Sequence, residues 1–309
     1  MDLKVKIKTL VLICILACCW GPSFLFIKLA IEEIPPLTLV ACRLLLGGIM
    51  VYAFLRVKGE SLWPFRAYWP HFVIMAIFAC SLPFLLISFG EIYISSSLAA
   101  ITNSTTPVCT IILAHFFIDS ERMTPKKAVG VALGFTGVFI VFLPTLLEKD
   151  PGSSFGAFLV FLSAISYAIA MVYSKKNLQG VVPLVAAAAQ LLIAALCLIP
   201  LALVIEQPYL LPMPSPKAVG AVLGLAILGT AIAFPVYYAV IRLAGASAVS
   251  TSTLLFPIIG VFLGVTVLGE QIYWNAYFGS AIILLGLLLS NNLIQLPLHF
   301  ARRSDFKLQ

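Results

Sequence analysis

Apolar residues dominate this chain in long, nearly uninterrupted runs, which short polar connections separate. A helix needs about 20 mostly apolar residues to cross about 30 Å of hydrocarbon, and ten runs have the necessary length. They span residues 9–31, 37–56, 68–90, 94–118, 125–146, 154–176, 183–205, 217–241, 246–268 and 274–296. Because lipid cannot satisfy backbone hydrogen-bonding groups, each run is predicted to be a helix. The pattern therefore predicts an all-α integral membrane protein with ten transmembrane helices.

The composition agrees with this pattern and leaves little room for a soluble domain. Of the 309 residues, 62% are hydrophobic and only 10% are charged, and the mean hydropathy is +1.11. A soluble domain carries about 25% charged residues. The connections between the apolar runs are short, so we expect no separate soluble unit.

The basic residues are distributed unevenly between the two sets of connections. With a cytoplasmic N-terminus, 15 of the 19 Lys and Arg residues fall on the cytoplasmic side. These are Lys4, Lys6, Lys8, Arg56, Lys58, Arg66, Arg122, Lys126, Lys127, Lys175, Lys176, Arg242, Arg302, Arg303 and Lys307. Such a bias favours ten spans with both termini in the cytoplasm. The net charge of +7 then reflects membrane topology, and we expect no nucleic-acid partner.

Cysteine and histidine give no sign of a redox or metal centre. All seven cysteines fall inside apolar runs, and their odd number argues against a disulfide framework. No Cys-x-x-Cys pair occurs, and the three histidines are scattered. Because metal sites need clustered ligands, we expect no metal and no cofactor.

The second half of the chain repeats the first. Residues 84–137 align with 234–286 at an offset of 150, which later slips to 149. The matched pairs are Phe84 with Phe234, Ser97 with Ser247, Pro107 with Pro257, Gly130 with Gly279 and Gly137 with Gly286. A weaker offset of 147 pairs Trp20 with Tyr167 and Lys28 with Lys175.

Each half contains five predicted spans. Since five is odd, the second half must enter the membrane from the opposite side, which makes the halves an inverted 5+5 repeat. The expected units are residues 1–146, residues 154–296 and a cytoplasmic tail at 297–309. In transporters built in this way, the substrate site lies near the middle of the membrane, between the repeats.

A polar segment, Ile101-Thr102-Asn103-Ser104-Thr105-Thr106-Pro107, stands in the middle of the fourth run. On a helix, Asn103 and Thr106 share one small or polar stripe, and we predict that they face a central cavity. The opposite side carries Leu98, Ile101, Val108 and Ile112 and is expected to face lipid. Close packing between helices is the alternative interpretation, because small and hydroxylated residues also serve that purpose.

Bent helices are expected at Pro22, Pro107 and Pro257, because proline removes a helical hydrogen bond. Pro22 lies in the segment Trp20-Gly21-Pro22-Ser23-Phe24, and Pro257 follows a hydroxyl-rich segment that contains Ser250. Ser23 and Ser250 therefore join the candidate cavity residues.

Two aromatic residues, Trp20 and Tyr167, occupy the middle of their spans. Tryptophan is usually enriched at the membrane interfaces, so a central one is atypical. Trp20 and Tyr167 are candidates for cavity walls that stack on an organic substrate, or they fill the core of the bundle. Tyr237, near the cytoplasmic end of the eighth run, suits a gate or, better, an interfacial belt.

Arg43 lies six residues into the second run, roughly 9 Å from its outer end. An arginine at the centre of a membrane helix costs about 2.5–3.5 kcal/mol, so it needs a partner or water. We favour a structural or gating role, with snorkelling or an anionic substrate group as alternatives. Lys28 is expected to snorkel, and Glu91 and Glu270 are expected to be solvated at the outer span ends.

The order of these features resembles the EamA-like family of the drug/metabolite transporter superfamily. The resemblance rests on Trp20-Gly21, Arg43, Pro107, a Glu121-Arg122-Met123-Thr124 turn and Gly130 with Gly137, and on Pro257, Gly269-Glu270 and Gly279 with Gly286. It covers residues 9–296, although Ser120-Glu121 replaces the Gly-Glu of the second half. The resemblance implies an inverted repeat around a central cavity lined by spans one, three, four, six, eight and nine.

The resemblance also implies a function. Members of this family move amino acids, other small metabolites or drugs, often as exporters. We expect a multi-pass transporter of the plasma membrane, in bacteria the inner membrane, that works by alternating access as a monomer or homodimer and has no catalytic residues. A multidrug or toxic-compound efflux transporter is the alternative; a membrane-embedded enzyme or a channel is less favoured, because mid-span acids and histidines are scarce.

Overall fold

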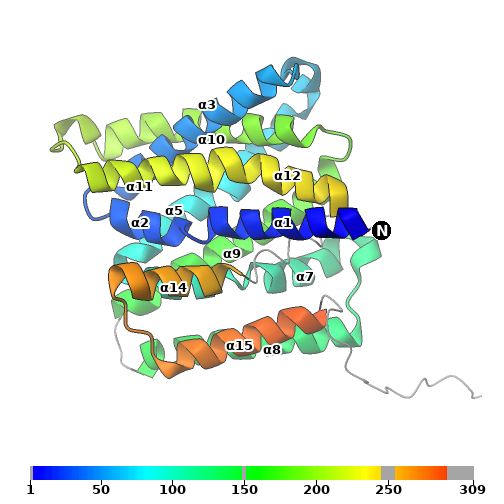
Figure 1. The fold of residues 1–309 in the computed structure, drawn as a ribbon, viewed down its shortest axis with the longest axis vertical. Coiled ribbons are helices and arrows are strands. Elements are labelled where there is room, and N and C mark those ends of the chain that lie inside the picture. The colour runs from blue at the N-terminus through cyan, green and yellow to red at the C-terminus, as the bar shows by residue number, and fades with distance from the viewer. Residues whose placement is uncertain (1–2, 148–150, 245–254, 291–309) are drawn as a thin grey trace, which may run out of the picture.

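The computed structural model describes residues 3–147, 151–244 and 255–290. Every regular element in these ranges is helical, and most of the helices run roughly parallel or antiparallel across the molecule (Figure 1). The helices of the first half are α1 (Leu3–Trp20), α2 (Ser23–Ala30), α3 (Pro36–Val57), α4 (Trp69–Met75), α5 (Leu82–Tyr93), α6 (Ser96–Asn103), α7 (Thr106–Phe117) and α8 (Pro125–Leu147). Those of the second half are α9 (Pro151–Asn177), α10 (Pro183–Ile205), α11 (Pro216–Ala226), α12 (Ala233–Ala244), α14 (Phe256–Leu268) and α15 (Trp274–Ser290).

Five short elements connect or interrupt these helices. The 3-10 helices are η1 (Trp63–Tyr68), η3 (Asp119–Glu121) and η4 (Pro208–Leu210). The other two, η2 (Ala76–Ser81) and η5 (Ile227–Ile232), are π-helical turns inside longer helices. Both π turns lie in apolar runs, the third and the eighth.

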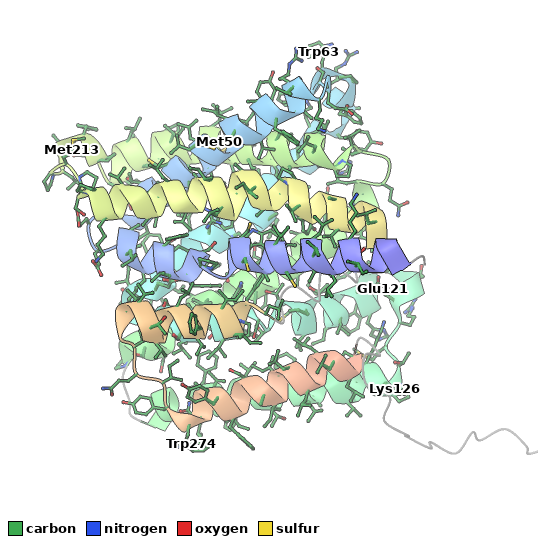
Figure 2. The ribbon with its side chains drawn as sticks, in the orientation of Figure 1. Met50, Trp63, Glu121, Lys126, Met213 and Trp274 are labelled. Atoms are coloured by element: carbon green, nitrogen blue, oxygen red, sulfur yellow. The ribbon has the colours of Figure 1, made fainter. Side chains whose placement is uncertain are left out.

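Eight continuous helices of the described chain are long and apolar enough to cross a membrane. Two shorter apolar helices, Phe256–Leu268 and Trp274–Ser290, occupy the ninth and tenth runs and adjoin residues outside the described ranges. Large apolar side chains such as Trp63 and Trp274 cover the outside of the bundle (Figure 2). The predicted all-helical class is confirmed, and the lengths and surface fit a membrane protein.

Two of the long helices are broken near a proline. The first breaks at Gly21 and Pro22, between α1 and α2. The fourth breaks at Ser104 and Thr105, and Pro107 lies in the first turn of α7. Pro257 likewise lies in the first turn of α14. Proline is tolerated in a first turn because the missing N–H would have no partner within the helix there.

Three hydroxyl groups around Thr105 donate hydrogen bonds to backbone carbonyls at the break between α6 and α7. Ser104 Oγ donates to the carbonyl of Ile101 at 2.5 Å, and Thr105 Oγ1 donates to the carbonyl of Thr102 at 2.8 Å. Thr106 Oγ1 donates to the carbonyl of Asn103, also at 2.8 Å. The carbonyls of Ile101 and Thr102 also accept the backbone N–H groups of Ser104 and Thr105, both at 3.1 Å, so the hydroxyls add second hydrogen bonds at this helix end.

The prediction that Ile101 and Val108 face lipid is wrong. They are only 1% and 2% exposed, and they share an apolar cluster with Val141 of α8 and Ile283 of α15. The break between α6 and α7 is the physical reason, because one straight helical wheel does not describe a helix that breaks in its middle.

Helices α8 and α15 cross closely at glycines. A Cβ on Gly137 would lie 2.6 Å from the carbonyl oxygen of Gly279, and a Cβ on Gly286 would lie 2.5 Å from that of Gly130. Small residues allow such close approach of membrane helices. Gly130 corresponds to Gly279 in the internal repeat, and Gly137 to Gly286. The two contacts are therefore the same contact made twice, as a two-fold relation between α8 and α15 requires.

Candidate functional site

The π turn η5 brings a backbone carbonyl of the second half to two side chains of the first half. The carbonyl of Gly229 accepts hydrogen bonds from Trp20 Nε1 at 3.1 Å and from Arg43 Nη2 at 3.4 Å. A π turn disturbs the regular i→i−4 ladder and is frequent at functional sites. The disturbed ladder leaves this carbonyl able to bind side chains in the interior of the bundle.

The π turn η2 makes the corresponding contact in the other direction. The carbonyl of Phe78 accepts a hydrogen bond from Ser166 Oγ of α9 at 2.8 Å. Phe78 and Gly229 are 151 residues apart, close to the repeat offset. Each half thus uses a π-turn carbonyl to hold the first long helix of the other half.

Arg43 is buried at the meeting point of α3 and η5. It is only 4% exposed, so it does not snorkel to the interface. Its Nε donates to Thr230 Oγ1 at 3.3 Å, and its guanidinium carbon lies 3.9 Å from the centre of the Phe84 ring. Among the described residues Arg43 forms no ion pair. The guanidinium also has further N–H groups that these contacts do not use.

Ser23 lies beside Arg43. Its hydroxyl is buried and has no hydrogen-bond partner among the described residues. A Cβ on Gly229 would lie 2.9 Å from Ser23 Oγ and 3.2 Å from Arg43 Nη2. The absence of a side chain at Gly229 therefore leaves room for Ser23 Oγ and the Arg43 guanidinium to lie close together.

Aromatic rings surround Trp20 on this side of the bundle. Its ring centre lies 5.7 Å from that of Tyr237, 6.5 Å from Phe234 and 5.8 Å from Phe256. Tyr237 thus packs on Trp20 inside the protein, and its assignment to an interfacial belt is wrong. The rings of Trp20 and Phe234 meet edge to face, a favourable arrangement for aromatic pairs.

Tyr167 and Asn103 are linked to this region through α9. The ring of Tyr167 lies 6.4 Å from Phe84, the ring that Arg43 covers. Ser163, one turn away on α9, donates from Oγ to Asn103 Oδ1 at 3.4 Å. The structure therefore brings together a set of residues that we call the Arg43 cluster. Its members are Trp20, Ser23, Arg43, Phe84, Tyr167, Gly229, Thr230 and Tyr237.

Six candidates are not members of the Arg43 cluster. Asn103 is linked to it only through Ser163, Pro22 and Pro107 lie at the helix breaks, and the other three are Thr106, Pro257 and Ser250. Thr106 is 4% exposed, and its hydroxyl donates a hydrogen bond to the carbonyl of Asn103. Pro257 borders an apolar groove, described below, rather than the Arg43 cluster. Ser250 lies outside the described residues.

Gly229, Thr230 and the role of Phe84 were not identified from the sequence. Two prolines near these residues could have indicated them. Pro83 and Pro235 follow the two π turns closely and lie inside apolar runs. Since proline cannot donate the regular i→i−4 hydrogen bond, such a pair marks two places where the helix must rearrange.

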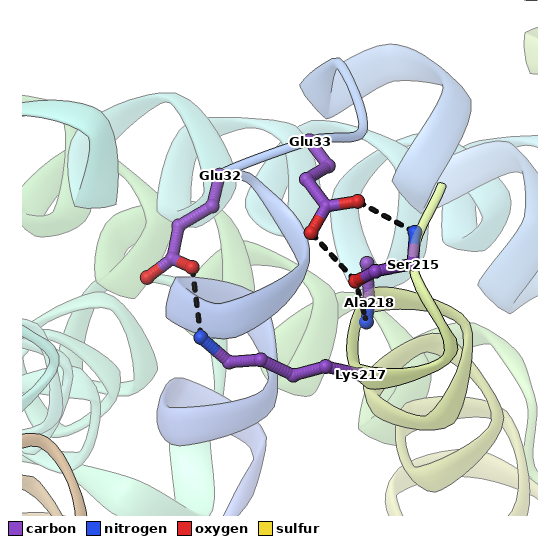
Figure 3. A network of polar contacts seen from close by, with 5 residues as sticks. All are labelled: Glu32, Glu33, Ser215, Lys217 and Ala218. Atoms are coloured by element: carbon purple, nitrogen blue, oxygen red, sulfur yellow. Dashed lines mark hydrogen bonds and ion pairs between the residues drawn. The ribbon is translucent and has the colours of Figure 1, made fainter. Parts of the chain in front are cut away.

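A second group of polar contacts closes one end of the bundle. We call it the Glu33 end; here α2 ends and α11 begins, close to Met213 and opposite Glu121 and Lys126 (Figure 2). Glu33 accepts hydrogen bonds from the Ser215 N–H and from Ser215 Oγ, both at 2.6 Å (Figure 3). Lys217 Nζ lies 2.9 Å from Glu32 Oε2 in the same network.

Two further carboxylates at the Glu33 end bind the N-terminus of a helix from the other half. Glu206 accepts from the N–H groups of Leu37 at 2.9 Å and Thr38 at 2.6 Å, at the start of α3. Glu270 accepts from the N–H groups of Ser96 at 2.8 Å and Ser97 at 3.0 Å, at the start of α6. Negative charge is stabilised at a helix N-terminus by the unpaired N–H groups and the helix dipole. Glu270 is therefore not simply solvated, as the sequence had suggested.

The hydrogen bonds from Ser215 and the nearby Lys217 ammonium lower the pKa of Glu33 below its usual value. The contact is exposed, so it contributes little to the stability of the whole protein. It does make the Glu33–Ser215 contact sensitive to acid, because protonation of Glu33 removes the negative charge that strengthens both hydrogen bonds from Ser215.

An apolar groove of about 450 Å³ lies between α14 and α15. Ile101, Pro257, Val261, Phe262 and Ile272 are among the residues that line it. Binding sites for polar metabolites need a few convergent polar groups, and this groove offers almost none. The Arg43 cluster is therefore the better candidate for a substrate site.

The model of the EamA-like transporter family matches the chain twice, over residues 7–143 and 154–292. The chain belongs to the EamA-like transporter family. It is 25% identical to the uncharacterized transporter YoaV of Bacillus subtilis over 88% of this chain and 92% of that protein. It is 27% identical to the uncharacterized inner membrane transporter YedA of Escherichia coli K12 over 87% of this chain and 86% of that protein.

A solved crystal structure has the same fold as this EamA-like protein. The TM-score is 0.68 at 20% identity, over 93% of this chain and 98% of that one. At this identity the likeness shows the fold alone. The family and the relatives identify this protein as a multi-pass membrane transporter, which confirms the resemblance found in the sequence.

Proposed function

We propose that this EamA-like protein is a secondary transporter that exports amino acids or other small metabolites across the plasma membrane by alternating access. The observation that carries this proposal is the buried guanidinium of Arg43, which has no counter-ion among the described residues. An uncompensated buried charge is strongly unfavourable, so its presence suggests a partner that arrives with the substrate.

The chemistry around Arg43 favours a carboxylate as that partner. Guanidinium groups bind carboxylates through paired N–H donors, which fixes the orientation of the ligand. The unpaired hydroxyl of Ser23 lies beside the guanidinium and can donate a further hydrogen bond. Trp20 and Tyr237 supply an aromatic surface next to this point for the organic part of the substrate. An amino acid or a small organic acid combines these features.

Alternating access is supported by how the two halves contact each other. The inverted 5+5 arrangement of ten spans remains our proposal; the reciprocal α8–α15 contact and the paired π turns support it. At the Glu33 end, Glu33, Glu206 and Glu270 each bind a helix of the opposite half. If the N-terminus is cytoplasmic, these contacts close the outer side, and they must separate when the site opens outward.

A multidrug efflux function is the second candidate. The aromatic rings around Trp20 favour it, because aromatic surfaces bind flat organic cations and neutral drugs. The unpaired positive charge of Arg43 argues against cationic drugs as the main substrates.

Transport into inside-out membrane vesicles tests the proposal, since export appears there as uptake. Vesicles with and without the protein are given a panel of labelled amino acids, organic acids and drug cations. We expect uptake of a carboxylate-bearing compound that Arg43→Ala abolishes, at equal amounts of protein in the membrane. Uptake of drug cations alone, unaffected by Arg43→Ala, would contradict the proposed substrate class.

A further inference from the structure

Glu91, in the last turn of α5, is a buried carboxylate that the Arg43 cluster does not use. Its side chain is 0% exposed, and neither carboxylate oxygen has a hydrogen-bond partner among the described residues. The sequence had suggested a solvated residue at a span end, which is wrong. A carboxylate shielded from water without donors is far more stable as the neutral acid than as the anion.

We propose that Glu91 is a proton-binding site of the transport cycle, reached from the Glu33 end. This inference rests on the proposed transport function. Glu91 takes up a proton from water when the Glu33 end is open. In the closed arrangement seen here the proton stays on the carboxyl group, sealed from that water. When the Glu33 end opens again, Glu91 regains contact with water there, and its proton passes to that water as the carboxyl group ionises.

The charged neighbours of Glu91 explain why this carboxyl group can change its charge. Lys28 of α2 and Glu270 are the groups with which it interacts electrostatically. Lys28 Nζ donates to the backbone carbonyls of Ile94, at 2.8 Å, and of Glu91 itself, and not to the Glu91 carboxylate. Glu270 is occupied with Ser96 and Ser97. One ammonium therefore stands beside two carboxyl groups, and a proton on Glu91 leaves the three groups neutral in sum.

The other helices that pack on α5 place their titratable groups well away from Glu91 along the helix axis. At Gly90, next to Glu91, α9 packs through Val160 and Gly156. The titratable groups that these helices direct toward α5 gather around Phe84, nearly two turns away. They are Tyr167 of α9, Arg43 of α3 and Cys80 of η2.

A proton fits this site better than a metal cation does. A sodium ion needs several oxygen ligands and would lie beside the Lys28 ammonium, which repels it. Lys28 also occupies the Glu91 and Ile94 carbonyls, the backbone oxygens that would otherwise be available. A proton needs only one carboxylate oxygen and no open space.

The position of Glu91 connects protonation to the closing of the Glu33 end. Ser96 and Ser97 follow Glu91 by a few residues and hold the Glu270 carboxylate. An ionised Glu91 would repel the Glu270 carboxylate and compete for Lys28. The charged form of Glu91 thus favours separation of Glu270 from α6, and the protonated form favours the closed contact.

Infrared spectroscopy of the purified full-length protein tests the site without any knowledge of the substrate. A protonated carboxyl group gives a C=O stretching band that a carboxylate lacks. We expect this band at neutral pH in the wild type, its loss in Glu91→Gln and a shifted band in Glu91→Asp. Glu60→Gln, in the connection after α3, should leave the band unchanged. A wild-type spectrum without the band, or a band that Glu91→Gln does not alter, overturns the proposal.

A cross-link at the Glu33 end tests the access route. Glu32→Cys and Lys217→Cys are joined by a reducible bifunctional reagent, with the seven natural cysteines replaced. In heavy water the Glu91 band should move to its deuterated position in the reduced protein and stay unmoved in the cross-linked protein. Equal exchange in both states overturns access through the Glu33 end. If the protein transports its substrate but lacks the Glu91 C=O band, the proton site is wrong and the proposed function stands. If the band is present but no transport occurs, the proposed function is wrong, and so is the link between Glu91 protonation and transport.

Discussion

Arg43 connects several elements in the interior of the bundle through one guanidinium group. It joins α3 to η5 through Thr230 and Gly229 and covers the Phe84 ring. Its carboxylate partner is proposed to be the substrate. Hydrogen bonds to charged groups contribute about 1.5–3 kcal/mol each, and about 1.4 kcal/mol corresponds to a factor of ten in binding. Losing a paired contact to a carboxylate should therefore bring transport below detection.

The corresponding prediction compares three substitutions in α3. In vesicles given the compound that the uptake panel identifies, Arg43→Ala should abolish transport and Arg43→Lys should restore only part of it. Lysine keeps the charge but lacks the planar fork that pairs with a carboxylate. Arg56→Ala, at the exposed end of the same helix, is the control and should transport normally. Normal transport in Arg43→Ala would show that the guanidinium has no part in binding.

Glu33 carries a prediction about pH. Because its pKa is lowered in the folded protein, its contact with Ser215 is fully formed above the ordinary glutamate pKa of about 4.3. The contact is lost as the pH falls through the lowered value. The exposed pair contributes little to global stability, so the measurement must be local.

Spin labels at the exposed residues Met213 and Ile92 provide this measurement. The distance distribution between them should be narrow at neutral pH and broaden below about pH 4. Glu33→Gln should broaden it already at neutral pH. A distribution in Glu33→Gln that matches the wild type at every pH would mean that Glu33 does not hold the two halves together.

At the scale of elements, the π turn η5 depends on Gly229. A Cβ there would meet Ser23 Oγ at 2.9 Å and Arg43 Nη2 at 3.2 Å. Overpacking of this kind costs about 1–3 kcal/mol, so Gly229→Ala should lower the thermal unfolding temperature in detergent and impair transport. Gly220→Ala, in the neighbouring helix α11, meets nothing within 4 Å. This control should be neutral or gain up to about 1 kcal/mol; equal unfolding temperatures for the two variants would contradict the crowding at Gly229.

The helices themselves were predictable because lipid imposes a strict rule on the sequence. A long apolar run in a membrane has few structures available other than a helix. The runs 37–56 and 183–205 correspond closely to α3 (Pro36–Val57) and α10 (Pro183–Ile205). The breaks near Pro22 and Pro107 were also indicated, although the helical wheel failed at Ile101 because it assumed one straight helix.

The π turns and the contacts of Arg43 could not be predicted from the pattern. A π turn adds about one residue to one turn of helix, which is less than the uncertainty in the ends of an apolar run. Thr230 is 187 residues from Arg43 in the sequence, and no periodicity reports a contact at that separation. The burial of Glu91 could not be predicted for a related reason, since the elements that lie beside it, α9 at Gly90 and Lys28 of α2, are distant in the sequence.

At the scale of the whole molecule, the charges divide the bundle into two different ends. The Glu33 end contains acidic residues that bind helix N-termini, among them Glu33, Glu206 and Glu270. The opposite end contains basic residues, including Lys58, Arg66 and Arg122. Basic connections stay preferentially in the cytoplasm. The opposite end is therefore expected inside the cell, and the Glu33 end outside.

Reporter fusions along the chain test this orientation and the ten-span arrangement together. Fusions after residues 60, 122 and 309 should report the cytoplasm, and fusions after residues 150 and 212 should report the external side. Residue 212 lies in the connection from α10 to α11, next to Ser215, so its fusion locates the Glu33 end directly. With both termini inside, the chain crosses the membrane an even number of times, and five spans in each half give the second half the opposite orientation. An external C-terminus would require an odd number of spans, and the inverted repeat proposed from the α8–α15 contact would then be wrong.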